Sequence, residues 1–184
     1  METYRLQAHP ACPPQSITGV RASVVSFDQD WLTLRWRVDG SGNLMLPPFA
    51  GKTRRDELWS TTCFELFLRT EGEETYTEFN FSPSDAWAAY DFTARRQRMR
   101  PRALSRPPVC TMRPGRTFAL FDVAVPASAL PAIPAALGLT AVLEETGGNK
   151  SFWAMDHGAA DSGKRPDFHD PSCLAARLAA TGAS

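Results

Sequence analysis

The sequence lacks the cysteine patterns of zinc-binding and disulfide-rich proteins. Its four cysteines lie far apart, at positions 12, 63, 110 and 173, and none of them forms a C-x-x-C pair. Closely paired cysteines are typical of structural zinc sites, and dense, evenly numbered cysteines are typical of disulfide frameworks. Neither a metal centre nor a disulfide scaffold is therefore predicted, and reduced thiols are expected.

Charge of one sign and long apolar runs are also missing. The 20 basic and 20 acidic side chains give a formal net charge of zero, whereas nucleic-acid-binding domains usually carry a basic excess. Residues 1–14 contain no apolar segment typical of a secretory signal. No apolar run reaches the length of a membrane-spanning helix. We therefore predict no nucleic-acid partner, no membrane partner and a cytoplasmic location.

Helical periodicity is scarce, and short alternating runs fill most of the chain. These runs are rich in β-branched and aromatic residues and are separated by turn residues. The spacing predicts an all-β fold, an antiparallel β-sandwich of the jelly-roll or immunoglobulin-like type, with about nine to eleven strands. One short C-terminal helix is expected after Pro171, over residues 172–180. Because no linker divides the 184 residues, a single domain spanning 1–184 is predicted.

The stretch from residue 58 to residue 92 places two carboxylates in segments that otherwise resemble a core. Glu65 and Glu78 each lie in an alternating run, and a polar turn at residues 70–73 separates the two runs. A hairpin closed around this turn sets Glu65 directly opposite Glu78. The same register pairs Phe67 with Tyr76 and Cys63 with Asn80. Because like charges directly opposite are destabilising, we expect compensation by an arginine, a metal, a shared proton or water.

The alternation also predicts a polar sheet face that could bind a sugar. Arg35 and Arg37 share one face of the run at residues 31–38, and we expect one of them to lie within reach of the two carboxylates. Aromatic rings stack on the apolar faces of a pyranose, while charged and amide groups hydrogen-bond its hydroxyls. The candidate ligand-binding residues are Arg35, Arg37, Trp59, Glu65, Glu78, Asn80, Trp87 and Trp153. The alternative is that the same charges only form ion pairs on a solvated sheet face.

Two neighbouring stretches resemble the DOMON-like superfamily. The first is Leu58-Trp59-Ser60-Thr61-Thr62-Cys63-Phe64-Glu65-Leu66-Phe67, and the second is Tyr76-Thr77-Glu78-Phe79-Asn80-Phe81-Ser82-Pro83, followed by Ala86-Trp87. They are similar to family 9 carbohydrate-binding modules. The C-terminal segments 151–157 and 166–169 resemble a bacterial DOMON-like subgroup. The resemblance implies a β-sandwich that binds a small-molecule sugar or haem without catalysis. Residues 60–62 stand where the modules carry aspartates, so no calcium site is predicted there.

Two alternatives would use the C-terminal histidines. A haem-binding module needs axial Met or His ligands, for which the candidates are Met155, His157 and His169, with Met45 or Met99. A metal-binding loop would use Asp156, His157, Asp161, Asp167, His169 and Asp170. This spacing fits no known metal loop, so no metal or other cofactor is predicted, and residues 166–169 are expected to dock over a sheet edge.

Two further alternatives concern charged clusters. Glu65 and Glu78, at about 5 Å, would have the separation of a retaining glycosidase pair, although a polar network in a non-catalytic module is the preferred interpretation. The six arginines between residues 95 and 106 form either a nucleic-acid patch or a solvated edge strand. Zero net charge favours the edge strand.

Overall fold

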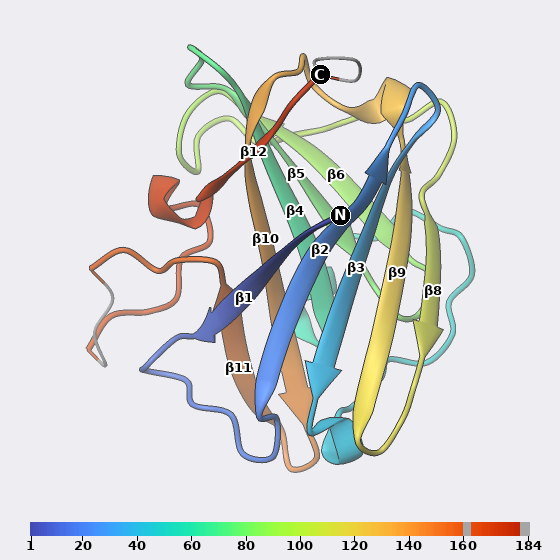
Figure 1. Cartoon of the computed structure of the whole chain (residues 1–184), viewed down its shortest axis with the longest axis vertical. Helices are drawn as coiled ribbons and strands as arrows, with labels where there is room; N and C mark the ends of the chain where they lie inside the picture. The colour runs from blue at the N-terminus through green and yellow to red at the C-terminus, as the bar shows by residue number, and fades with distance from the viewer. Residues whose placement is uncertain (160–162, 181–184) are drawn as a thin grey trace.

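The computed structural model describes residues 1–159 and 163–180. It contains a twelve-stranded antiparallel sheet, shown in Figure 1, with the order β7-β6-β5-β4-β10-β11-β1-β2-β3-β9-β8, and β12 pairs with β10 beside this path. The strands are β1 (Glu2–Ala8), β2 (Gly19–Phe27), β3 (Trp31–Asp39), β4 (Cys63–Thr70), β5 (Tyr76–Phe81), β6 (Trp87–Phe92), β7 (Arg100–Pro101), β8 (Val109–Arg113), β9 (Phe118–Pro126), β10 (Ala135–Glu145), β11 (Asn149–Ala154) and β12 (Ala176–Leu178). The short 3-10 helices are η1 (Ser41–Asn43), η2 (Leu58–Ser60), η3 (Ala127–Ala129) and η4 (Pro171–Cys173).

The all-β antiparallel prediction is confirmed, and the strand number slightly exceeds the prediction. A sandwich of two separate sheets is not confirmed, because β1 joins the two halves of the structure. This strand pairs with β2 over residues 2–6 and then with β11 through Gln7 and Ala8. The result is one curled sheet, in which the half formed by β2, β3, β9 and β8 lies in front of β4, β5 and β6 in Figure 1.

The main core lies between the two halves of the curled sheet. Alternation on β3 turns Leu32, Leu34, Trp36 and Val38 to the inside, where all four are buried. The indole of Trp36 packs against the rings of Phe64 on β4 and Phe121 on β9, at centroid distances of 5.5 and 6.3 Å. The contact between Trp36 and Phe64 crosses from one half to the other and helps to hold the curled sheet closed, whereas Phe121 is the cross-strand neighbour of Trp36 in the same half.

The outer face of the other half of the sheet, at β4, β5 and β6, is also buried. The candidate site lies on this face. Phe67, Tyr76 and Phe92 form an apolar cluster on the outer face of β4, β5 and β6, together with Phe168 from the C-terminal segment. We call residues 163–175 the C-terminal cover. Because both faces of β4 and β5 are covered, the two strands are almost completely buried. Their polar residues therefore lie among apolar neighbours.

The predicted helix over residues 172–180 is wrong. Only one 3-10 turn forms, with the Asp170 side chain accepting a hydrogen bond from the Ser172 backbone N–H, and the chain then continues as β12. Residues 176–178 pair with residues 135–137 of β10, so tertiary pairing overrides the local helical pattern. Gly138 permits this path, because a Cβ there would lie 2.7 Å from the carbonyl oxygen of Cys173. In the described chain no helix is long and apolar enough to cross a membrane.

Candidate functional site

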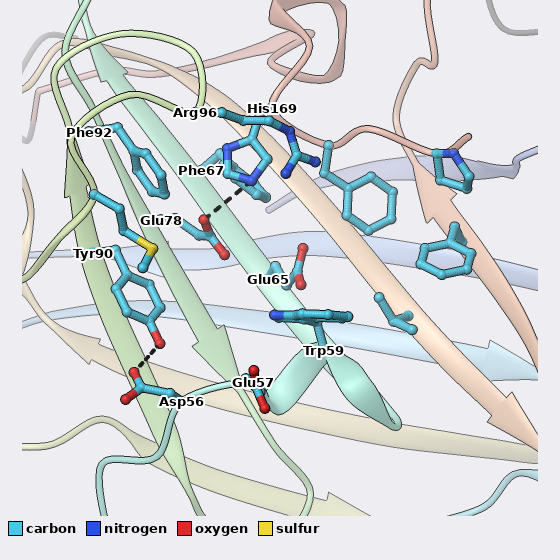
Figure 2. Close-up of a pocket in the computed structure, with 15 residues that line it drawn as sticks. Asp56, Glu57, Trp59, Glu65, Phe67, Glu78, Tyr90, Phe92, Arg96 and His169 are labelled. Atoms are coloured by element: carbon cyan, nitrogen blue, oxygen red, sulfur yellow. Dashed lines mark hydrogen bonds and ion pairs between the residues drawn. The ribbon is translucent and has the colours of Figure 1, made fainter. Parts of the chain in front are cut away.

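A pocket of about 670 Å³ opens on the outer face of β4, β5 and β6 (Figure 2). Glu65, Phe67 and Glu78 project into it from β4 and β5, and Tyr90 and Phe92 line it from β6. Residues outside the sheet complete the wall: Asp56, Glu57, Trp59, Arg96, Met99, Pro166, Phe168 and His169. The sheet therefore supplies the pocket floor, and the loops supply most of its rim.

The predicted hairpin register is wrong by two residues, while the predicted faces are right. Glu65 lies opposite Asn80 and Phe67 opposite Glu78, because the turn occupies residues 71–74 in place of 70–73. Moving the turn by one residue changes every partner by two positions but keeps each side chain on its face. Glu65 and Glu78 are therefore diagonal neighbours on the same face, which lessens the repulsion of a directly opposed pair.

The two carboxylates are buried with little compensation from cations. Glu65 is 3% exposed and Glu78 is 7% exposed. Glu65 Oε2 accepts a hydrogen bond of 2.9 Å from Thr140 Oγ1, and Glu78 Oε1 accepts one of 2.7 Å from Asn80 Nδ2. Burial raises the pKa of both carboxyls, and repulsion by Glu78 raises the pKa of Glu65 further. Burial therefore favours the protonated form of both carboxyls.

His169 lies beside this pair but does not neutralise it. Its Nδ1 is 2.7 Å from the Tyr76 hydroxyl, and its Nε2 is 3.7 Å from Glu78 Oε2. Burial lowers the pKa of His169 to about 4, and the nearby Arg96 guanidinium lowers it in the same direction. The imidazole is consequently neutral at pH 7, and its contact with Glu78 is not an ion pair.

Arg96 lines the pocket, but its guanidinium forms an ion pair with Asp167 in the C-terminal cover. Asp167 Oδ1 accepts hydrogen bonds from Arg96 Nε and Nη2 at 3.0 and 2.8 Å, and Asp167 Oδ2 accepts one from Arg95 at 2.6 Å. Burial alone would raise the pKa of Asp167, but these hydrogen bonds outweigh it and lower the pKa to about 2. The ion pairs attach the loop after β6 to the cover and fix one side of the pocket.

The arginine-rich segment is therefore only in small part the predicted edge strand. Of residues 95–106, only Arg100 and Pro101 pair as a strand, whereas Arg102 binds Asp91 at 2.7 Å. The sequence did not identify Arg96 as a pocket residue. The six arginines of residues 95–106 differ mainly in their contacts with the C-terminal cover, which is distant in the sequence. The six-arginine spacing itself contained no signal for that choice.

The opposite end of the pocket is formed by the segment that leads into β4. The Tyr90 hydroxyl donates to Asp56 Oδ1, which also pairs with Arg54 at 2.8 Å. Trp59 follows on η2 and remains 55% exposed. Figure 2 shows its indole facing Glu65 across the pocket, so a large aromatic surface and a buried carboxylate share one space.

The other predicted aromatic and amide residues lie elsewhere. Trp153 is buried in the main core, and Trp87 packs against that same core from its partly buried position on β6. Both belong to the inner face, because Trp87 pairs with Phe81 and Trp153 with Ala141, which are core residues. Asn80 lies on the outer face and hydrogen-bonds Glu78, but it does not line the pocket.

The predicted contact between the arginines of β3 and the carboxylates is wrong. Arg35 Nε pairs with Asp122 at 2.6 Å, and Arg37 Nε pairs with Asp39 at 2.8 Å. Both arginines belong to the front half of the sheet, on the side away from the core that β3 shares with β4. Alternation identified their polar face correctly but could not show which strands share that face.

The haem and metal candidates are dispersed, apart from two that reach the pocket. Among the described candidates, only His169 and Met99 line it, whereas His157 contacts the Gln7 carbonyl and Met155 packs against the main core. Asp161 lies outside the described residues. Within residues 1–159 and 163–180, no three His, Cys, Asp or Glu side chains are grouped to hold a metal ion. Residues 166–169 cover the outer sheet face instead of a sheet edge.

Comparison with known proteins gives likenesses of structure only. No protein-family model matches the chain, and no curated protein matches it. A crystal structure from Bacteroides uniformis ATCC 8492, described as a candidate carbohydrate-binding protein, superposes with a TM-score of 0.61 at 14% identity, covering 92% of this chain and 83% of that chain. A family 9 carbohydrate-binding module from Caldicellulosiruptor kristjanssonii in complex with glucose gives a TM-score of 0.42 at 9% identity, over 82% of this chain and 73% of that chain. A family 9 carbohydrate-binding module from the same organism in complex with cellotriose gives a TM-score of 0.44 at 9% identity, over 82% of this chain and 72% of that chain. At these identities the first likeness shows a shared fold.

Proposed function

We propose that the protein binds a small carbohydrate in the outer-face pocket and does not catalyse its conversion. The observation that carries this proposal is the pairing of an exposed indole, Trp59, with two buried carboxyls across one cavity of about 670 Å³. A pyranose needs a flat apolar surface for its C–H face and fixed polar groups for its hydroxyls. Trp59 and Tyr90 supply the first kind of surface, and Glu65 and Glu78 supply the second kind of group.

The proposed site contains fewer residues than the polar/aromatic face that the sequence predicts. Of the predicted binding set, Trp59, Glu65 and Glu78 belong to the proposed site, with Asn80 holding Glu78 in place. The fold shared with the candidate carbohydrate-binding protein supports the proposal, as does the sequence resemblance to family 9 modules. Haem has weaker support, because the nitrogens of His169 face Tyr76 and Glu78 in place of an open axial position.

Isothermal titration calorimetry with a panel of mono- and disaccharides tests the proposal. We expect at least one sugar to bind, and Trp59→Ala to weaken it by about ten-fold or more, as expected when a stacking ring is lost. Phe49→Ala is the matched control, because Phe49 is 82% exposed and lies outside the pocket. Absence of binding by every sugar would refute the proposal. Release of reducing ends that Glu65→Gln abolishes would instead favour a glycosidase.

A further inference from the structure

Acidic side chains outnumber basic ones in the lining of the pocket. Four carboxyl groups line it, from Asp56, Glu57, Glu65 and Glu78, against one arginine. Two of these charged groups already have partners outside the pocket: Arg96 is bound to Asp167 and Asp56 to Arg54. Since His169 is neutral at pH 7, the two glutamates of the floor have no cation of their own among the described residues.

Glu65 has the free acceptor that a ligand would use. Its Oε2 accepts the Thr140 hydroxyl, whereas its Oε1 has no hydrogen-bond partner in the described part of the chain. The side chain is nine-tenths buried or more and lines the pocket, and Figure 2 shows its carboxylate pointing into the open space above Trp59. A buried carboxylate with one free oxygen and no counter-charge is costly unless something binds it.

The chemistry of that partner follows from its surroundings. Carboxylates form their strongest hydrogen bonds with cationic donors, and an ammonium group also gains from nearby aromatic rings such as Trp59 and Tyr90. A divalent metal fits less well, because the described residues offer no group of three ligands. A neutral sugar hydroxyl would leave the two carboxyls in the protonated form that burial favours, whereas a cationic amine would bind an ionised carboxylate through charge-assisted hydrogen bonds.

We infer that the ligand is an amino sugar, whose protonated amine binds between Glu65 and Glu78 while its ring stacks on Trp59. This inference rests on the proposed function and specifies the class of carbohydrate. The ammonium donates to the free Oε1 of Glu65 and balances the charge of one carboxylate, while the other carboxyl of the pair stays protonated. The pair thus gains a cation that the described residues do not supply. The pocket thus distinguishes a sugar amine from a hydroxyl or an acetamide at the same position.

Calorimetry at pH 7 with four probes tests the inference: 2-amino-2-deoxyglucose, 6-amino-6-deoxyglucose, glucose and N-acetylglucosamine. At least one amino sugar is expected to bind about ten-fold or more tightly than glucose, the gain of replacing a neutral by a charge-assisted hydrogen bond. If glucose binds as tightly as both amino sugars, the inference fails and sugar binding stands. If none of the four probes and no other sugar of the panel binds, both proposals fail.

Variants place the amine at the glutamates. In Glu65→Gln the ratio of amino-sugar to glucose affinity is expected to fall about ten-fold, and Glu78→Gln provides a second, independent measurement should the first variant not fold. Glu2→Gln, which removes an exposed carboxylate on β1, is the charge-matched control and should preserve the ratio. An unchanged ratio in both pocket variants would overturn the assignment, because the amine would then bind elsewhere.

Discussion

In the absence of added ligand, the stability of the protein should fall as the pH rises above neutrality, because of the buried pair Glu65 and Glu78. An ordinary glutamate ionises near pH 4.5 in the unfolded chain, and burial raises both pKa values in the folded chain. A raised pKa means that the folded state holds protons that the unfolded state has released. The stabilising contribution is therefore complete below pH 4.5 and is lost as the pH rises through the folded pKa.

The size of the effect follows from proton linkage. For one carboxyl that stays protonated only in the folded state, the free energy of unfolding drops by about 1.4 kcal/mol per pH unit. Two such pH units remove about 3 kcal/mol, which lowers the melting temperature of a chain of this size by roughly 6–12 °C. His169 acts in the opposite sense and at lower pH: its pKa is lowered to about 4, so its contribution is present above pH 6.5 and lost on acidification.

Differential scanning calorimetry from about pH 6.5 to about pH 8.5 isolates the glutamate pair from the histidine. Glu65→Gln should reduce the slope of melting temperature against pH by half or more, since it removes one titrating group and the repulsion on the other. Glu145→Gln is the matched control: Glu145 is also buried, but hydrogen bonds from Ser16 and neighbouring backbone N–H groups outweigh that burial and lower its pKa. A flat wild-type profile, or an unchanged slope in Glu65→Gln, would refute the reasoning.

Three other outcomes are expected. Arg35→Ala should leave sugar affinity within about two-fold by calorimetry, because Arg35 pairs with Asp122 on the other half of the sheet; a loss of ten-fold would contradict the placement. Asp167→Asn should weaken the attachment of the C-terminal cover and lower sugar affinity by about ten-fold, with faster limited proteolysis in residues 163–175 as the second measurement; unchanged affinity and proteolysis would show that the ion pairs are dispensable. Gly138→Ala should destabilise the protein by about 1–3 kcal/mol in urea denaturation, because the new methyl group meets the carbonyl of Cys173; a stability equal to wild type would contradict the close approach.

The alternation of the sequence predicted much of the local structure. Periodicity of two identified β3, β4 and β5 and assigned the faces of Glu65, Glu78 and Asn80 correctly, since that property depends only on position within a strand. It also predicted the antiparallel all-β class. The predicted hairpin register was wrong, because a turn shifted by one residue satisfies the same pattern of faces.

Residues brought together over long sequence distances could not be predicted in this way. Arg35 and Glu65 both occupy alternating strands, but only the strand order shows that their strands lie in different halves of the sheet. Trp87 and Trp153 resemble stacking residues in sequence, yet both turn toward the core. The rim depends on the C-terminal cover, whose place is determined by the ion pairs of Asp167 and by the pairing of the following strand, β12, with β10.

The two-sided burial of β4 has a consequence for how binding selectivity could diverge or be redesigned. Glu65 stands between Phe64 and Leu66, two fully buried residues whose side chains fill the main core behind the pocket. The floor therefore tolerates few substitutions, because each one that moves β4 also disturbs the packing of both halves of the sheet. Glu57 and Trp59 of the rim are free of this restriction, since both are exposed and lie outside the strands. Substitutions at Glu57 and Trp59 are therefore the simplest way to change ligand specificity, because they leave Glu65 and Glu78 in the floor unchanged.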